Sequence, residues 1–168
     1  MKRAIVLAIS VILALTMAAP TVLAQSENGV APGDASGTLE LAPNDPRFPG
    51  SCDFPMRLDL SGKAKTIELP NEVFIFTSPG LDVTITNRDN GEQATFNITG
   101  AFHQTTAENG DVTTKITGRN LPFDPDAGVN LTIGNFSFVF DKDGNLLKSF
   151  ADPPVGNGQV IDVCELLS

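Results

Sequence analysis

Hydrophobic and polar residues alternate with a period of two along most of the chain. Leu81, Val83 and Ile85 alternate with polar side chains, and three phenylalanines occupy every second position of 136–140. Because successive side chains of a strand point to opposite faces, this alternation sets one face of each strand against a core. No stretch of 11 or more residues shows helical spacing. The pattern therefore predicts an all-β protein.

Glycine-containing pairs separate the alternating segments. Asn90-Gly91, Asn109-Gly110 and Asp143-Gly144 are typical of type I′ turns, which need a positive φ at two positions. Because so many short strands supply apolar residues for two inner faces, we expect an antiparallel β-sandwich, with a closed β-barrel as the alternative. The turns and breaks predict about nine strands: 56–60, 64–69, 73–77, 81–88, 93–102, 111–118, 130–140, 146–150 and 158–163.

Residues 1–24 are typical of a secretory signal peptide. Lys2 and Arg3 precede an apolar stretch, and small residues lie at −3 and −1 of a cleavage site after Ala24, with cleavage after Ala19 as the alternative. The apolar run is shorter than the ~20 residues that a helix needs to span a bilayer. The sequence therefore predicts a secreted, extracellular protein with no membrane insertion after cleavage.

The segment 25–51 differs in composition from the rest of the chain. It contains four prolines, four glycines and few apolar side chains, so we expect a flexible leader. Apolar and polar residues alternate over 38–41, and the alternative for these residues is a short strand paired with the edge of a sheet. The remaining residues, 52–168, suit a single β-sandwich domain.

Cys52 and Cys164 are the two cysteines of the chain. An even pair in an oxidising compartment predicts a disulfide bond, and with two cysteines only one intramolecular pairing exists. Such a bond would enclose nearly the whole folded region and contribute roughly 4–5 kcal/mol by loop-closure entropy.

The chain is acidic. Loss of residues 1–24 removes Lys2 and Arg3 and no acidic residue, which changes the formal net charge from −9 to −11. A charge of this sign keeps a protein soluble and repels phosphate backbones and anionic lipid surfaces. We therefore expect that the protein does not bind nucleic acid. We also expect a monomer, and the sequence does not identify a binding partner.

The frame of turns and cysteines carries a resemblance. It runs from "CDFP" near 52, through "TNRDNGEQATFNITG" and "GDVTTKITGRNL", to "LTIGNFSFVFDKDGN" and "VIDVCELL". Over about 52–168 the chain resembles a group of small, uncharacterised secreted proteins of actinobacteria. The resemblance implies a β-sandwich bracketed by two cysteines and implies no catalytic residue.

Two acidic loops are the candidates for metal chemistry. Asp141, Asp143 and Asn145 have the spacing of a calcium loop, but the glycine comes two residues early and both flanks alternate as strands. Asp124 and Asp126 lie two apart in the loop 121–128, where an aspartate commonly begins an Asx turn. We therefore expect turns at both places and no bound cofactor, with a weak calcium site as the alternative.

Residues for other catalytic chemistry are few. His103 is the single histidine, and no G-x-S-x-G motif is present, so a Ser-His-Asp triad is not expected. The chain has 11 phenylalanines and neither tryptophan nor tyrosine. Since phenylalanine lacks a polar handle, it favours core positions over sugar stacking.

These observations favour a secreted, non-enzymatic binding or interaction module. One alternative is an extracellular hydrolase that uses aspartates of the loops 121–128 and 141–145. The other is a carrier of a small apolar ligand, held in a pocket between phenylalanine-rich sheets.

Overall fold

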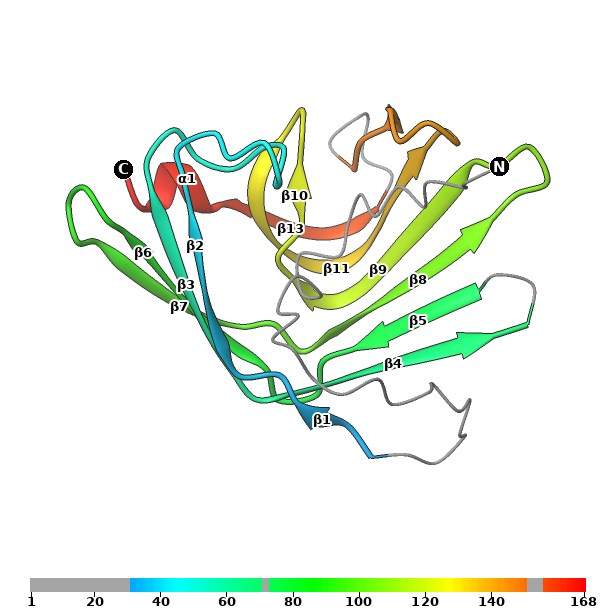
Figure 1. The fold of residues 1–168 in the computed structure, drawn as a ribbon, viewed down its shortest axis with the longest axis horizontal. Helices are drawn as coiled ribbons and strands as arrows, with labels where there is room; N and C mark the ends of the chain where they lie inside the picture. Colours follow the sequence, from blue (N-terminus) through cyan, green and yellow to red (C-terminus); the bar gives the residue numbers. More distant parts are fainter. Residues whose placement is uncertain (1–30, 71–72, 151–155) are drawn as a thin grey trace.

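A computed structural model describes residues 31–70, 73–150 and 156–168 (Figure 1). These residues form two antiparallel sheets and one short helix, α1 (Val163–Leu166). The all-β expectation and the arrangement in two sheets are confirmed. No helix in these three ranges is long and apolar enough to cross a membrane.

The small sheet contains four strands in the order β2-β3-β6-β7. Their bounds are β2 (Gly37–Leu41), β3 (Met56–Ser61), β6 (Asp82–Asn87) and β7 (Gln93–Asn97).

The large sheet contains nine strands. Seven follow the order β1-β4-β5-β8-β9-β11-β10, and β12 and β13 also pair with β11. Their bounds are β1 (Gly33–Asp34), β4 (Lys63–Leu69), β5 (Val73–Thr77), β8 (Gly100–Thr106), β9 (Val112–Asn120), β10 (Phe123–Asp124), β11 (Gly128–Phe140), β12 (Leu146–Lys148) and β13 (Asn157–Asp162).

Four short connections in the described residues pass between the sheets and form a common corner. They are residues 35–36 between β1 and β2, Gly62 between β3 and β4, residues 78–81 between β5 and β6, and residues 98–99 between β7 and β8. Ser78 joins two of them, because its hydroxyl donates to the carbonyl oxygen of Ile98 at 2.6 Å and its backbone N–H donates to Gly100 at 3.1 Å. Strands that change sheets at a corner hold the two sheets at a fixed angle.

This corner corrects one predicted strand. The alternation over 93–102 predicts a single strand, but the chain turns at Ile98 and Thr99, so that β7 lies in the small sheet and β8 in the large one. The period-two pattern continues through the bend because both halves keep an apolar face inward. Periodicity therefore does not reveal the change of sheet.

The three glycine turns are confirmed as turns, but their predicted type is wrong. Among the described residues, Asn44 is the one non-glycine residue with a positive φ, so the residues before the glycines are not left-handed. The glycines themselves are left-handed, with φ of 80° at Gly91, 90° at Gly110 and 87° at Gly144. This geometry is that of a type I turn followed by a left-handed glycine, which also matches the twist of a hairpin.

The predicted flexible leader is wrong over the part that the structure describes from Gly33 onward. β2 pairs with β3 along its whole length, and Leu41 and Phe48 are buried, with 3% and 5% of their surface exposed. The fold therefore begins before Cys52. Residues 1–30, which include the predicted signal peptide, lie outside the described residues.

The predicted disulfide is present and closes the end of the fold opposite the corner. Cys52 and Cys164 are bonded across a sequence separation of 112 residues, with their Cα atoms 5.4 Å apart. Beside this bond, the side-chain amides of Asn87 and Asn90 both donate to the carbonyl oxygen of Leu167, at 2.8 and 3.0 Å. These contacts hold α1 against the hairpin of β6 and β7.

A row of four glycines crosses the large sheet. Gly100, Gly118, Gly134 and Gly158 are opposite one another on β8, β9, β11 and β13. A Cβ atom at Gly134 would lie 2.2 Å from the backbone oxygen of Asn157, so a larger residue does not fit. Figure 1 shows that β9 and β11, which carry two of these glycines, are strongly curved.

The core falls into two clusters on either side of this row. Odd-numbered residues of the first half of β11, such as Leu131, join the cluster that packs on the small sheet. Even-numbered residues of its second half join the other cluster: Phe136, Phe138 and Phe140, with Ile116 and Phe150.

Candidate functional site

The loop of Asp141, Asp143 and Asn145 is the expected turn, a hairpin corner between β11 and β12. The carboxylate of Asp141 accepts hydrogen bonds from the backbone N–H groups of Asp143 and Asn145 and from the side-chain amide of Asn145. These bonds, that of the Asn145 side chain foremost, lower the pKa of Asp141. Asp143 is paired with Lys142 at 3.0 Å. Leu146 packs against the core cluster of Phe136, Phe138 and Phe140, whereas Leu147 is 57% exposed.

The second acidic loop is an Asx turn between β10 and β11. Asp124 is buried, and one oxygen of its carboxylate accepts from the backbone N–H groups of Asp126 and Ala127. Its other oxygen accepts from the Ser149 hydroxyl at 2.8 Å. Asp126 is exposed. The carboxylate thus stabilises the turn and connects it to the end of β12.

These two loops are not brought together into one site. They lie at the two ends of β11, and the described residues contain no group of three or more His, Cys, Asp or Glu side chains that could hold a metal ion. The expectation that neither loop holds a cofactor stays a prediction, and a weak calcium site stays its alternative. His103 lies within β8, opposite Ile75 and Lys115, and is partly exposed.

Phenylalanines are gathered on one face of the large sheet. Phe76, Phe102, Ile116 and Phe136 are direct cross-strand partners on β5, β8, β9 and β11, and partners in an antiparallel ladder lie on the same face. The next row contains Phe74, Gln104, Thr114 and Phe138. We define the phenylalanine face as Phe74, Phe76, Phe102, Phe136, Phe138 and Phe140.

The two ends of the phenylalanine face differ in burial. On β11, Phe136, Phe138 and Phe140 are 7%, 3% and 7% exposed. On β5 and β8, Phe76 and Phe102 are partly exposed and Phe74 is 40% exposed. The rings of Phe76 and Phe102 meet edge to face at 6.0 Å between centroids. The β5–β8 end therefore presents aromatic rings to solvent.

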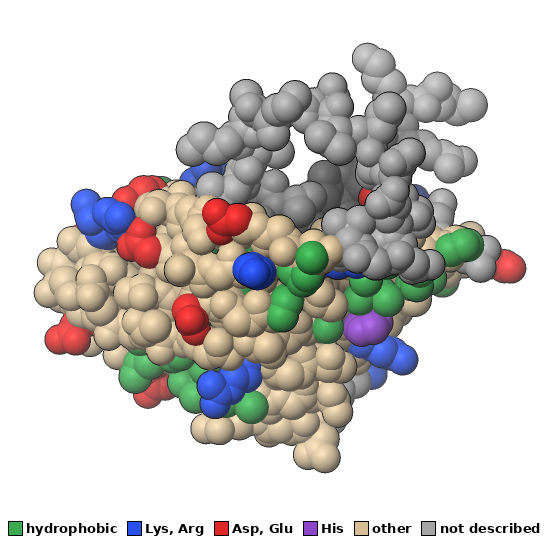
Figure 2. All heavy atoms as spheres, turned by 90° about the horizontal axis from the view of Figure 1, so that it is seen from below, with side chains coloured by type: hydrophobic (Ala, Val, Ile, Leu, Met, Phe, Trp, Pro, Cys, Tyr) green, Lys and Arg blue, Asp and Glu red, His purple; other side chains and the backbone are tan. Residues whose placement is uncertain are grey.

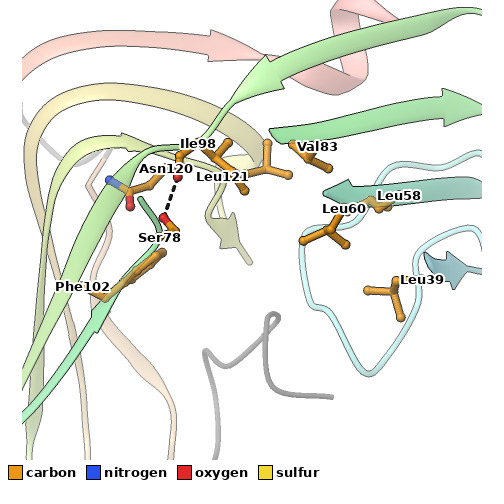
Figure 3. A pocket seen from close by; sticks show the side chains of 9 residues that line it. All are labelled: Leu39, Leu58, Leu60, Ser78, Val83, Ile98, Phe102, Asn120 and Leu121. Atoms are coloured by element: carbon orange, nitrogen blue, oxygen red, sulfur yellow. Dashed lines mark hydrogen bonds between the residues drawn. The ribbon is translucent and has the colours of Figure 1, made fainter. Parts of the chain in front are cut away.

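Phe102 also borders a cavity between the two sheets (Figure 3). The cavity has a volume of about 20 Å³, which is room for about one water molecule. Its wall is apolar except for Ser78 and Asn120, and the side-chain oxygen of Asn120 has no hydrogen-bond partner. The cavity is too small for an organic ligand. Its remaining lining residues are Leu39, Leu58, Leu60, Val83, Ile98 and Leu121.

A larger groove adjoins the buried end of the phenylalanine face. It has a volume of about 350 Å³, within the ~300–1,000 Å³ typical of small-molecule sites. Phe136 belongs both to the phenylalanine face and to the groove wall. The described residues that line the groove are Ala127, Asn130, Phe136, Phe150, Gly156, Gly158 and Val160.

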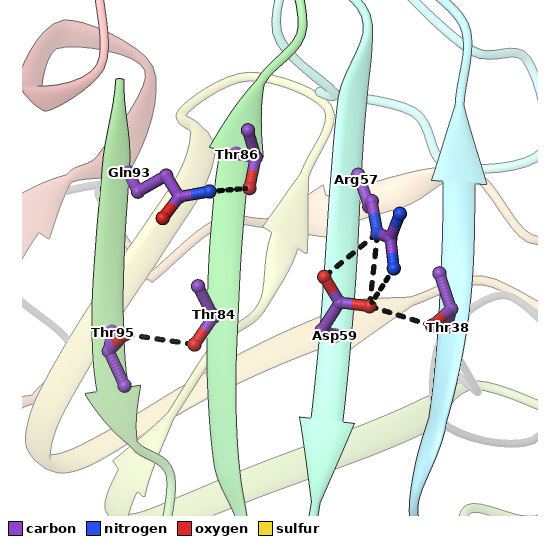
Figure 4. A network of polar contacts seen from close by, with 7 residues as sticks. All are labelled: Thr38, Arg57, Asp59, Thr84, Thr86, Gln93 and Thr95. Atoms are coloured by element: carbon purple, nitrogen blue, oxygen red, sulfur yellow. Dashed lines mark hydrogen bonds and ion pairs between the residues drawn. The ribbon is translucent and has the colours of Figure 1, made fainter. Parts of the chain in front are cut away.

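The outward face of the small sheet has a different character (Figure 4). Its polar side chains bond to one another: Asp59 accepts from Arg57 and from Thr38, and Thr84 bonds Thr95 at 2.8 Å. The hydrogen bonds from Arg57 lower the pKa of Asp59. A face that satisfies its own polar groups is a solvated surface, so we do not place the site there.

The sequence predicts which phenylalanines of one strand share a side, but it does not predict that phenylalanines of different strands lie on one face. Alternation places Phe136, Phe138 and Phe140 on one side of a strand, whereas the partners of Phe74 and Phe102 depend on strand order. The run 73–76, which is apolar at every position, is the one local signal that β5 carries apolar residues on both faces.

The fold and the site define a disulfide-closed, two-sheet β-protein with an aromatic face on its larger sheet. Comparison of the chain gives no significant match to a protein-family model, to a curated protein or to a solved structure.

Proposed function

We propose that this protein is a secreted, non-enzymatic binding protein whose ligand is a small apolar molecule held on the phenylalanine face. The observation that carries the proposal is the register that gathers six phenylalanines on one face, with Phe74 left 40% exposed. Burial of a phenylalanine side chain contributes about 1.5–3 kcal/mol. A ligand that covers the exposed rings therefore gains the free energy of burying them, because these rings stay in contact with water in the protein alone.

The exposed end of the face sets the chemistry of the ligand. Phenylalanine rings offer no hydrogen-bonding group, so the contact is hydrophobic. Beside Phe74, in the same row, lie Gln104, whose amide donates to Thr114 at 3.2 Å, and the exposed Glu68. An elongated apolar molecule with one polar end, neutral or cationic beside Glu68, matches this arrangement.

Secretion is supported by the sequence and by the disulfide. The first 24 residues have the pattern of a signal peptide, and the bond between Cys52 and Cys164 suits an oxidising compartment. A soluble protein that carries an apolar molecule through an aqueous exterior needs a face of this kind.

The hydrolase alternative finds no support in the placement of its aspartates. Hydrolysis by carboxylates requires two of them to converge on one bond. Asp124 is buried in hydrogen bonds to its own turn, and Asp141 is bonded to Asn145 at the other end of β11. We therefore favour binding over catalysis.

The experiment is a fluorescence titration with the neutral probe N-phenyl-1-naphthylamine. The protein should bind it saturably, and Phe74→Ser and Phe102→Ser should each weaken binding about tenfold, the free energy of roughly half a buried phenylalanine. Leu147→Ser is the matched control, because Leu147 is 57% exposed and lies on β12 away from the face. Equal binding by Phe74→Ser and Leu147→Ser, or no saturable binding at all, would show that the proposal is wrong.

A further inference from the structure

The opposite face of the large sheet carries a separate set of residues. Cross-strand pairing places Ile67, Ile75, His103, Lys115 and Ser137 in one row of β4, β5, β8, β9 and β11. The neighbouring row on one side begins with Lys65 and Thr77. The neighbouring row on the other side begins with Leu69 and Val73 and ends with Val139, which lies opposite Lys148 on β12. We call this surface the outer face.

Charge on the outer face is opposite to that of the whole protein. Lys65, Lys115 and Lys148 lie on it and form no ion pair with any described residue, whereas Arg47, Arg57 and Lys142 elsewhere are paired with aspartates. None of the residues in its three rows is Asp or Glu. Lys63 is not counted, because Asp34 lies directly opposite it. A chain of formal net charge −9 thus presents three rows of one face whose charged residues are all basic.

Aliphatic side chains alternate with these lysines. Ile67, Val73, Ile75 and Val139 are partly exposed, Leu69 is 38% exposed, and none of them belongs to either core cluster. Figure 2 shows hydrophobic and basic side chains beside the single histidine, while most acidic side chains in that view lie farther away. The outer face therefore combines positive charge with exposed aliphatic surface.

We propose that the outer face docks on the surface of an anionic lipid bilayer. Lysines near such a surface are attracted to its headgroups, and aliphatic side chains between them enter the boundary of the acyl chains. A soluble polyanion would use the lysines and leave the aliphatic side chains in water. A second copy of the chain, docked by the same face, would set lysines near lysines. The lipid surface is the partner that uses both components.

The net charge of the chain does not prevent this docking. Exposed charges separated by more than about 8 Å are largely screened at physiological ionic strength, so the basic face acts locally. Each lysine near an anionic membrane surface strengthens binding about fivefold, and three together on the order of 100-fold.

The test is flotation of the mature protein with vesicles of phosphatidylcholine alone and of phosphatidylcholine with 30% phosphatidylglycerol. We expect binding to the anionic vesicles alone, reduced on the order of 100-fold in Lys65→Gln/Lys115→Gln/Lys148→Gln. The control, Lys63→Gln/Arg88→Gln/Lys142→Gln, changes the net charge equally and should bind as the unmodified protein. Lys115 and Lys148 are exposed, Lys65 is partly exposed, and the ion pair of Lys142 is at the surface, where such pairs add little stability. Far-UV circular dichroism should therefore be the same for both variants.

Three results would overturn the proposal. They are an absence of binding to the anionic vesicles, equal loss of binding in the two triple variants, and equal affinity for neutral and anionic vesicles. Dextran sulfate distinguishes the remaining partner class: if Ile75→Thr lowers vesicle binding but leaves dextran sulfate binding unchanged, the lipid assignment stands. If Ile75→Thr affects neither, the partner is a polyanion and the assignment is wrong. Phe74→Ser should not change docking, which keeps this test separate from that of the phenylalanine face.

Discussion

Removal of the disulfide is the perturbation with the largest expected effect on stability. In Cys52→Ala/Cys164→Ala the crosslink across 112 residues is lost, and loop-closure entropy gives about 4–5 kcal/mol for a loop of that size. A domain of this length has a total stability of about 5–15 kcal/mol. The double variant should therefore lose a third or more of its stability and about 10–20 °C in Tm.

Urea unfolding followed by far-UV circular dichroism measures this loss. Intrinsic fluorescence is a poor probe here, because the chain has no tryptophan and no tyrosine. The hydrogen bonds from Asn87 and Asn90 to Leu167 remain in the variant, so α1 keeps a native attachment and the folded state is retained. A loss below about 1 kcal/mol, or free thiols at both positions in the unmodified protein, would refute the reasoning that the bond restrains the unfolded chain.

Three further effects follow from single sites. Asp45 is buried, and its hydrogen bonds with Arg47 depress its pKa. The ionised carboxylate therefore stabilises the fold above about pH 4, and this stabilisation is lost as the pH falls. In Asp45→Asn the free energy of unfolding should fall less steeply with acidification than in the unmodified protein. Gly134→Ala should lower the free energy of unfolding in urea by about 3 kcal/mol, because its Cβ would overlap the backbone oxygen of Asn157, whereas Gly33→Ala, with no neighbour within 4 Å, should be neutral. Calcium should leave the Tm unchanged, since the Asp141 carboxylate is already bonded to Asn145; a rise would identify an ion site.

The fold class could be predicted from the sequence because it depends on local periodicity. Alternation at Val83 and Ile85 and the glycine turns place most strands within a few residues of their observed bounds. The two cysteines predict their own pairing because no other partner exists. These features need no knowledge of which strands are neighbours.

Features that depend on strand order could not be predicted. The bend at Ile98 keeps the alternation intact, and Phe48, in the loop between β2 and β3, is buried beside Phe123 of β10. The phenylalanine face likewise needs the order β5-β8-β9-β11, which brings Phe76 and Phe136 into one row. Long-range pairing, and not residue type, makes the candidate site.

The central claim is that an apolar ligand covers the exposed end of the phenylalanine face. The most direct measurement is an NMR titration of protein labelled at phenylalanine with N-phenyl-1-naphthylamine. The account predicts that the ring resonances of Phe74, Phe76 and Phe102 shift together and saturate, while those of the core residues Phe48 and Phe54 stay in place. Shifts confined to Phe48 and Phe54, or none at any ring, would contradict it.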